Sequence, residues 1–312
     1  MNQEKQAVNR PLQNVQTLDE TFLWTALVSP MLLNGDVDFV TLEKLALQQA
    51  NAGNGITLLG STGEGLALTP AEQLAVVECV SGLSLNVPIM VSVGGYNLSN
   101  QLAWLSKCNE LAISGYLLTC PIYSKPGVKG LTQWFNALLD QAKHPCMIYN
   151  VPSRCGINIP TIVMENIQAH EKCWAMKEAS GDVGIFTSYA RHCPDLALFS
   201  GEDAMVPQLL KAGVKGLVSV AANVWPHATH RYVELALSGQ HQTLFPVWKN
   251  AVDALFQEAS PIPVKVLMHL TNMLNYPTLR PPLSEVEITE NPCALKSLMA
   301  MGIEINQWLE QS

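Results

Sequence analysis

Residues 55–94, GITLLG-STGEGLAL-TPAEQLAVVECVSGL-SLN-VPIMVSVG, contain one complete unit of strand, loop, helix and strand. The two ends, 55–60 and 87–94, are short apolar runs bounded by turn residues, which is typical of buried strands. The middle segment, 69–83, has apolar residues at helical spacing, and Thr69 followed by Pro70 is a common cap and first-turn pair. The strand-to-strand distance predicts a parallel βα unit rather than a hairpin.

The same unit recurs through the first 220 residues. Strands are predicted over 24–29, 55–60, 87–94, 114–120, 145–151, 173–179, 196–201 and 214–220. Helices are predicted between them, for example over 38–52, 69–83 and 99–112. Eight parallel units that close on themselves form a (β/α)8 TIM barrel of the α/β class, which is the predicted fold. A doubly wound open sheet is the alternative.

The two ends of the chain differ from this pattern. Residues 1–20 begin with a polar stretch that we expect to be a loose N-terminal extension. After the barrel, predicted over 21–224, apolar residues recur at helical spacing without strand alternation. We therefore expect residues 225–312 to be a C-terminal helical extension that serves packing or assembly.

The composition excludes several classes of protein. With 48% hydrophobic and 14% charged residues, the chain is too apolar to be disordered. A formal net charge of −8 and the lack of a basic run argue against nucleic acid as a partner. No apolar run reaches the roughly 18 residues that a membrane-spanning helix needs, and the polar start is not a secretory signal.

Cysteine, histidine and glycine usage predicts neither a metal nor a cofactor. The eight cysteines form no C-x-x-C pair and lie mostly in apolar segments, which fits free thiols in a reducing cytoplasm. Of the seven scattered histidines, His227 and His230 can share a helix face, but no third ligand is near. No dinucleotide fingerprint is present, and the turn at 60–63 is not a P-loop.

Lys177 is the strongest candidate for chemistry. Active sites of barrels lie at the C-terminal ends of the strands, and Lys177 is near the end of the sixth predicted strand. Strict alternation directs Trp174 and Met176 toward the helices, and Ala175 and Lys177 into the barrel. Loss of solvent there favours a neutral amine, a nucleophile suited to Schiff-base formation. The alternative is a lysine that extends to solvent or pairs with Glu178.

Four other segments at strand ends have two interpretations each. Tyr149 is either a proton donor and acceptor beside Lys177 or an ordinary core tyrosine. The Gly60–Gly63 turn offers hydroxyl and N–H groups to a carboxylate, or it is only a tight turn. Arg154 is either a carboxylate-binding guanidinium or a surface arginine. Tyr123 lies in another loop of the barrel mouth, where aromatic residues often serve packing alone.

Three motifs together resemble the dihydrodipicolinate synthase and N-acetylneuraminate lyase family of class I aldolases. They are GSTGE at 60–64, YNVPSRCG at 149–156 and KEASG at 177–181, in the order and spacing of the family. The resemblance extends over residues 22–300. The 149–154 segment is more similar to the synthases, because the lyases usually lack an arginine there.

The resemblance implies a cofactor-free aldol reaction of pyruvate. Lys177 would form an imine with pyruvate, and the derived enamine would attack aspartate 4-semialdehyde. The product would be 4-hydroxy-tetrahydrodipicolinate, a precursor of lysine and diaminopimelate. Tyr149 would pass protons through Ser61 to Tyr123. The implied substrate-binding residues are Thr62 for the pyruvate carboxylate, Arg154 for that of the semialdehyde, and Gly201 and Val218 in the pocket lining.

The resemblance also implies an assembly, because the family's counterpart of Tyr123 crosses into the neighbouring subunit's site. The expected state is a homotetramer built as a dimer of dimers. One departure from the family is Ser61, which replaces the usual threonine. It keeps the hydroxyl, so we expect the proton relay to survive with looser positioning.

A second departure concerns feedback by lysine. Ile122 stands where many members have a tyrosine that contacts the inhibitor. The other positions that surround lysine in inhibited members keep only the asparagine here; they are Gly65, Pro70, Gln73, Asn97 and Gln101. We therefore expect free lysine to inhibit weakly or not at all.

Two other functions remain open. A related pyruvate lyase would cleave a 2-keto-3-deoxy sugar acid or N-acetylneuraminate, with Arg154 incidental to the reaction. A non-catalytic barrel would bind a small keto acid. The joint presence of Ser61, Tyr123, Tyr149 and Lys177 argues against the latter, since binding alone does not need all four.

Overall fold

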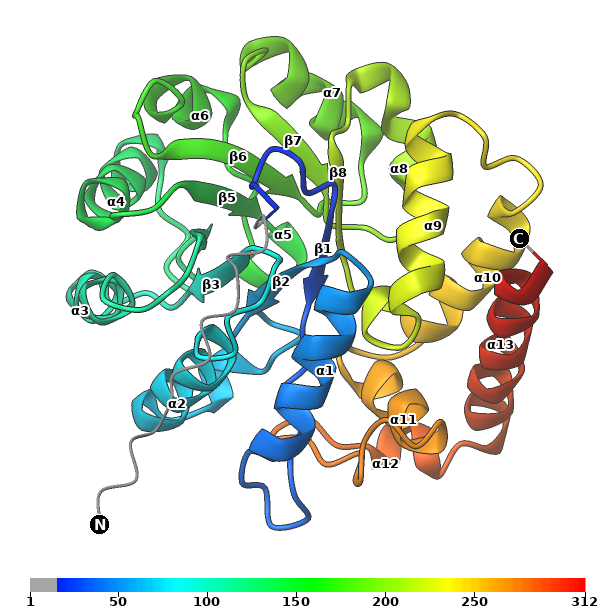
Figure 1. Cartoon of the computed structure of the whole chain (residues 1–312). Coiled ribbons are helices and arrows are strands. Elements are labelled where there is room, and N and C mark those ends of the chain that lie inside the picture. Colours follow the sequence, from blue (N-terminus) through cyan, green and yellow to red (C-terminus); the bar gives the residue numbers. More distant parts are fainter. Residues whose placement is uncertain (1–15, 312) are drawn as a thin grey trace, which may run out of the picture.

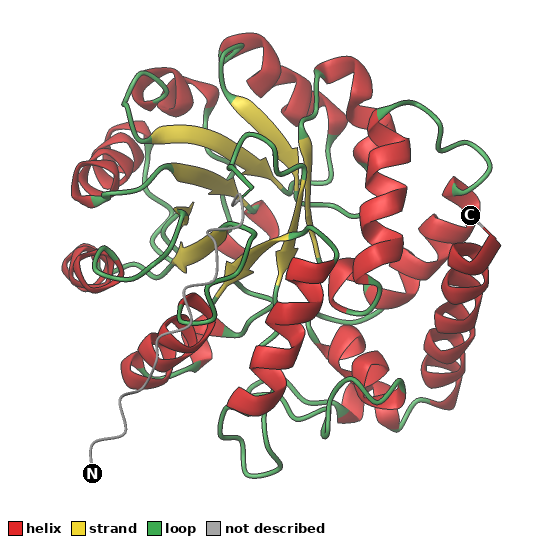
Figure 2. Ribbon diagram, viewed as in Figure 1, coloured by secondary structure: helices red, strands yellow, loops and turns green. Residues whose placement is uncertain are grey.

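Eight short strands alternate with helices along the chain. The strands are β1 (Leu23–Ala26), β2 (Gly55–Leu58), β3 (Ile89–Val93), β4 (Gly115–Thr119), β5 (Cys146–Asn150), β6 (Cys173–Glu178), β7 (Ala197–Ser200) and β8 (Gly216–Ser219). In this computed structural model, which describes residues 16–311, they pair in chain order, all parallel, and β8 pairs with β1 (Figure 2). The predicted (β/α)8 barrel is confirmed, and the open-sheet alternative is wrong.

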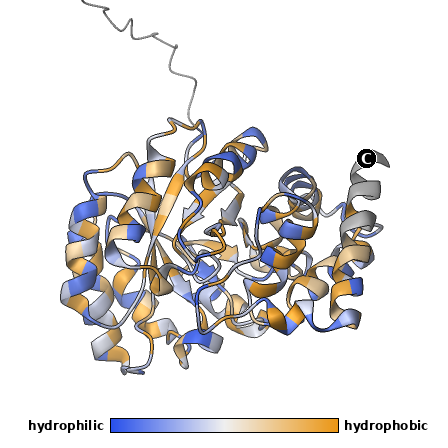
Figure 3. Cartoon of the chain, turned by 90° about the horizontal axis from the view of Figure 1, so that it is seen from below, coloured by the Kyte–Doolittle hydropathy of each residue, from blue (hydrophilic) through white to orange (hydrophobic). Residues whose placement is uncertain are grey.

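Helices surround the barrel on its outside (Figure 1). They are α1 (Phe39–Asn51), α2 (Pro70–Ser81), α3 (Leu98–Cys108), α4 (Val128–Gln141), α5 (Pro152–Cys155), α6 (Thr161–Ile167), α7 (Val183–His192), α8 (Val206–Leu209) and α9 (Pro226–Leu237), with 3-10 turns η1 (Gly65–Ala67), η2 (Leu210–Ala212) and η3 (Ala221–Asn223). The predicted start of α2 is confirmed, because Thr69 and Glu72 form a reciprocal capping box. Figure 3 shows hydrophobic and hydrophilic segments alternating along these helices, as expected for elements with one buried face.

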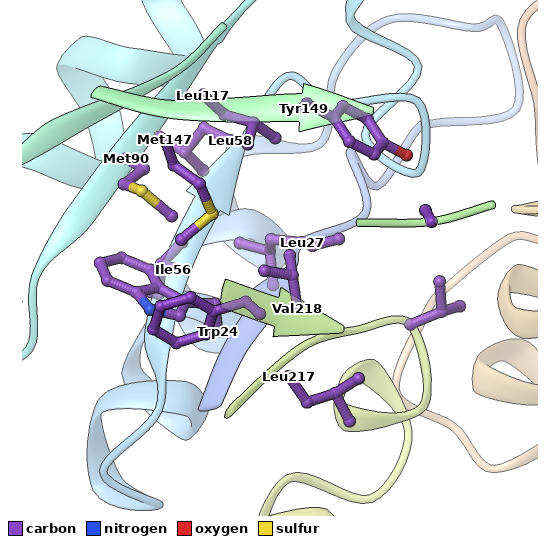
Figure 4. Packing of buried hydrophobic residues seen from close by; sticks show 14 of the residues in the cluster. Trp24, Leu27, Ile56, Leu58, Met90, Leu117, Met147, Tyr149, Leu217 and Val218 are labelled. Carbon is purple, nitrogen blue, oxygen red and sulfur yellow. The ribbon is translucent and has the colours of Figure 1, made fainter. Parts of the chain in front are cut away.

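One alternating set of strand residues fills the barrel interior. Tyr149 lies opposite Lys177, and Lys177 opposite Phe199, so these three side chains share the inner face. Trp24 fills the N-terminal end of the barrel (Figure 4). A Cβ atom on Gly55 would come within 2.6 Å of the Trp24 ring, so glycine is needed at that position.

Trp174 does not face the helices, and that prediction is wrong. The β5–β6 register passes from Cys146 opposite Cys173 to Met147 opposite Ala175, which leaves Trp174 as an inserted residue. Its ring packs against Trp24, with 6.2 Å between ring centres, and against Phe199, at 5.7 Å. The irregularity redirects Trp174 alone, and Lys177 keeps its predicted inward direction.

The helices after α9 form the predicted C-terminal helical extension beside the barrel (Figure 1). They are α10 (Phe245–Leu255), α11 (Ile262–Leu270), α12 (Val286–Thr289) and α13 (Pro292–Gln311). α9 packs against β8 and α8, so the ring of helices around the barrel continues past residue 224. The division at that residue stays a prediction.

Residues 16–20 lie against the N-terminal end of the barrel. The Asp19 carboxylate accepts a hydrogen bond of 2.8 Å from the Trp174 indole, and the Gln16 N–H donates to the Asn86 carbonyl at 3.0 Å. Residues 1–15 of the predicted loose extension lie outside the described residues. Within residues 16–311, no helix is both long and apolar enough to cross a membrane.

Candidate active site

Lys177 and Tyr149 are neighbours at the C-terminal end of the barrel. Each is only 6% exposed, and the Lys177 Nζ lies 4.3 Å from the centre of the Tyr149 ring. Glu178 does not pair with Lys177, because its Oε1 accepts from the Asn150 amide at 3.0 Å and from the Ser180 N–H at 2.8 Å. The alternative of a solvent-exposed or Glu178-paired lysine is therefore wrong. The buried amine faces the tyrosine ring.

The turn after β2 presents unused backbone donors. Leu59 and Glu64, with φ of 60° and 52°, lie at its two ends in the left-handed region. The Glu64 N–H donates to the Ser61 carbonyl, which closes the turn. Elsewhere in the described chain, no carbonyl accepts from the N–H groups of Ser61 or Thr62. Two adjacent N–H groups with a hydroxyl nearby can hold a carboxylate.

A cavity of about 330 Å³ opens at this end of the barrel. Ser61, Tyr149 and Arg154 line it together. Its wall continues to the ends of β3 and β4 at Ser92 and Thr119. The C-terminal part of the chain contributes Arg280, Pro282 and Leu283.

Besides Tyr123, four predicted site residues lie outside the lining of this cavity. Lys177 lies on β6, next to Tyr149, and Thr62 is buried in the turn after β2. Gly201 follows β7, where an added Cβ would come within 2.9 Å of the Lys177 Cε. Val218 is fully buried on β8, on the same inner face as Lys177. Gly201 thus leaves the space that the lysine side chain occupies.

Tyr123 is separate from the other predicted residues in the single chain. Its side chain is 88% exposed, its φ is 70°, and its ring centre lies 6.5 Å from that of Tyr96. Its neighbour Ile122, not Tyr123, lines the cavity. The structure of one chain does not place the Tyr123 hydroxyl near Tyr149.

Arg154 is attached to the C-terminal part of the chain. Its Nη2 donates to the Ser260 carbonyl at 3.0 Å, just before α11. The rest of the guanidinium remains at the cavity wall, available to a second carboxylate.

Sequence reasoning assigned no role to several charged residues near the site. Burial raises the pKa of Glu202 to about 7; the Asp203 carboxylate adds to the rise and the charge of Lys177 opposes it. Asp203 is itself fully buried and accepts hydrogen bonds from Ser219 and two backbone N–H groups. Both acids closely follow the end of β7, and this position could have marked them as candidate site residues in the sequence. Lys265, the buried partner of Glu64, had no such signal.

Within the described chain, no three or more His, Cys, Asp or Glu side chains gather as metal ligands. The absence of a cofactor stays a prediction. The candidate site is therefore a cavity lined by a phenol, a hydroxyl and a guanidinium, with the Lys177 amine next to the phenol and two free N–H groups in the adjoining turn. This set can form an imine with a small keto acid and hold its carboxylate.

Comparisons with known proteins identify the family. The chain belongs to the Dihydrodipicolinate synthetase family, whose model matches residues 20–300. It is 43% identical over 294 residues to a 4-hydroxy-tetrahydrodipicolinate synthase of Wolbachia pipientis wMel, covering 94% of this chain and 99% of the relative. It is 44% identical over 289 residues to the enzyme of the same name from Francisella tularensis subsp. novicida, covering 92% of this chain and 96% of that one.

Solved structures agree with this assignment. Dihydrodipicolinate synthase from Aquifex aeolicus superposes with a TM-score of 0.86 at 26% identity, covering 92% of this chain and 98% of that one. The enzyme from Cyanidioschyzon merolae, solved with lysine bound, gives a TM-score of 0.85 at 29% identity, covering 92% and 98%.

Proposed function

We propose that this chain condenses pyruvate with aspartate 4-semialdehyde to give 4-hydroxy-tetrahydrodipicolinate, on the route to lysine and diaminopimelate. The observation that carries the proposal is the Lys177–Tyr149 pair beside a cavity lined by Ser61 and Arg154. Relatives at 43% and 44% identity bear the name of this synthase. The 149–154 segment, with its arginine, favours the synthase over a sugar-acid or sialic-acid lyase.

The chemistry begins at the Lys177 amine. Nζ attacks the ketone carbon of pyruvate, and loss of water from the carbinolamine leaves an iminium ion. The iminium draws electrons from the methyl group, which releases a proton and becomes an enamine. The enamine carbon then attacks the aldehyde, whose oxygen takes up a proton. The amino group of the semialdehyde part then attacks the imine carbon and displaces Nζ, which closes the six-membered ring of the product and returns the free lysine amine.

We assign these proton transfers to Tyr149, whose ring centre lies 4.3 Å from Nζ. Ser61 lines the same cavity and would continue the relay. Tyr123 is exposed on one chain, which fits a hydroxyl supplied to a second subunit's site. We therefore propose a homotetramer, built as a dimer of dimers, that works in the cytoplasm.

The remaining predicted residues bind substrate. The N–H groups of Ser61 and Thr62 would hold the pyruvate carboxylate, and Arg154 would receive that of the semialdehyde. Gly201 and Val218 would give the lysine and the bound keto acid their space on the inner face.

Lysine feedback is expected to be weak. Gly65, Gln73, Gln101 and Ile122 line the cavity with neutral groups. Glu64 is the single carboxylate among the lining residues that the structure gives, and both of its oxygens already accept hydrogen bonds. An added ammonium group finds no free carboxylate. Micromolar inhibition by lysine in a steady-state assay would refute this.

The test is turnover of pyruvate with aspartate 4-semialdehyde, followed through a dihydrodipicolinate reductase that consumes NADPH. We expect activity in the wild type and in Lys211→Ala, an exposed control, and none in Lys177→Ala. Borohydride with pyruvate should add one adduct, on Lys177. An adduct without turnover points to a related pyruvate lyase, to be tried with 2-keto-3-deoxy sugar acids. A folded protein with neither result is a non-catalytic barrel.

A further inference from the structure

A fully buried ion pair links the C-terminal helices to the turn that carries Ser61 and Thr62. The Lys265 Nζ on α11 lies 2.7 Å from Glu64 Oε1, and both side chains are at most 1% exposed. The same Nζ donates to the Ser29 carbonyl at 3.0 Å. The other carboxylate oxygen, Glu64 Oε2, accepts from the Arg280 N–H at 2.7 Å.

The turn that this pair holds has an unfavourable backbone. Leu59 and Glu64 both have positive φ, a conformation that costs a non-glycine residue about 1 kcal/mol or more. A Cβ on Gly65 would come within 2.0 Å of the Leu59 carbonyl oxygen, so the chain doubles back tightly. The Ser29 hydroxyl also holds the turn by donating to the Gly63 carbonyl at 2.7 Å. Contacts from outside the turn must therefore fix its shape.

We propose that Lys265 is a positioning residue for the keto-acid substrate. Through Glu64 it fixes the Ser61–Thr62 N–H groups where they meet the pyruvate carboxylate. The inference rests on the proposed function, and it assigns to α11 a part in substrate binding beyond packing. Lys265 itself touches neither substrate nor the reacting atoms.

Stability alone does not require charge at this position. A buried ion pair loses its hydration, and a well-packed apolar pair of similar volume is often as stable. Burial lowers the pKa of Lys265, and the adjacent Glu64 carboxylate opposes that effect. The ion pair fixes the orientation of the Glu64 carboxylate, because each of its oxygens accepts from one donor, Lys265 or the Arg280 N–H. Two other charged groups lie around Lys265. The charge of Arg280 lowers the pKa of Lys265, and the charge of Glu285 raises it.

The first test uses Lys265→Met. Glu64 then keeps a buried carboxylate without a cation, which is strongly unfavourable unless it takes up a proton or the turn moves. At high pH we expect the turn to move, with kcat/KM for pyruvate reduced at least tenfold. At low pH the neutral Glu64 permits the native turn, so the defect shrinks. The wild type and Lys249→Met, which removes an exposed ion pair with Asp253, should show no such added pH dependence.

The second test, Glu64→Gln with Lys265→Met, keeps the volume and leaves no buried charge, so the protein should fold even where the single variant does not. We expect the added pH dependence to vanish while the KM for pyruvate stays several-fold raised. The KM for the semialdehyde, which Arg154 binds, should change less than threefold.

Two results would overturn the proposal. They are a wild-type KM for pyruvate in both variants, or equal losses for both substrates at every pH, as a purely structural role predicts. Borohydride trapping separates this outcome from failure of the proposed function. If borohydride and pyruvate do not trap the wild-type protein, the proposed function is wrong. If they trap it and the variants have the same KM for pyruvate as the wild type, only the role of Lys265 is wrong.

Discussion

The space left by Gly201 is needed by the lysine that would carry the substrate. A Cβ added at position 201 would lie 2.9 Å from the Lys177 Cε and 2.5 Å from the Ala179 Cβ. Carbon atoms normally approach no closer than about 3.5 Å, so the two overlaps are about 0.6 and 1 Å. The Ala179 Cβ is fixed by its backbone, whereas Lys177 has rotatable bonds. Gly201→Ala is therefore expected to displace the lysine.

The magnitude follows from these distances. Overpacking of this kind costs about 1–3 kcal/mol of stability. A displacement of about 1 Å at a reacting group costs about 100-fold in rate. We expect Gly201→Ala to melt a few degrees lower and to form the pyruvate imine about 100-fold more slowly.

The assay is borohydride trapping with pyruvate, with the adduct measured by mass over time. Gly127→Ala is the matched control, because Gly127 is exposed, has negative φ and would have nothing within 4 Å of its new Cβ. It should be trapped at the wild-type rate. Wild-type trapping in Gly201→Ala, with unchanged melting temperature, would refute the argument that this space belongs to Lys177.

Three other predictions concern acids and the arginine. The pKa of Glu202 rises from 4.5 to about 7 on folding, so the contribution of this carboxyl to stability is fully present below about pH 4.5 and is lost as pH rises through 7. Glu202→Gln should thus gain about 1–2 kcal/mol at pH 8 and nothing at pH 4.5 in urea unfolding, and an equal gain at both would contradict it. Asp203→Ala leaves Ser219 and two backbone N–H groups unpaired and should lose at least about 2 kcal/mol by the same method. Arg154→Ala should raise the KM for the semialdehyde at least tenfold with normal pyruvate trapping, and failed trapping would remove Arg154 from that role.

The barrel could be predicted because its signals are local. Each strand is an apolar run, and the turns and caps between runs, such as Thr69 with Glu72, are read within a few residues. Trp174 was misplaced because alternation holds only while the register is regular. The insertion there depends on the fit of its ring against Trp24 and Phe199, residues far away in the sequence.

The grouping of several candidate site residues could be predicted for a related reason. Lys177, Tyr149, Ser61 and Arg154 are at strand ends, and parallel strands bring such ends together. Lys265 was part of a segment read as packing helix, and its partner Glu64 is 201 residues away. No periodicity links two residues at that distance, so only the folded chain shows that they meet.

The C-terminal helices reach the candidate site at two groups that we propose bind substrate, Arg154 and the turn that contains Ser61 and Thr62. The Ser260 carbonyl accepts a hydrogen bond from Arg154, and Lys265 donates to Glu64. Ser260 and Lys265 are five residues apart, at the start of α11. Lys177, by contrast, lies on β6, inside a barrel whose strands hold one another in register. It follows that substitutions at the start of α11 act mainly on substrate affinity, whereas substitutions on the inner face of the barrel act on imine formation.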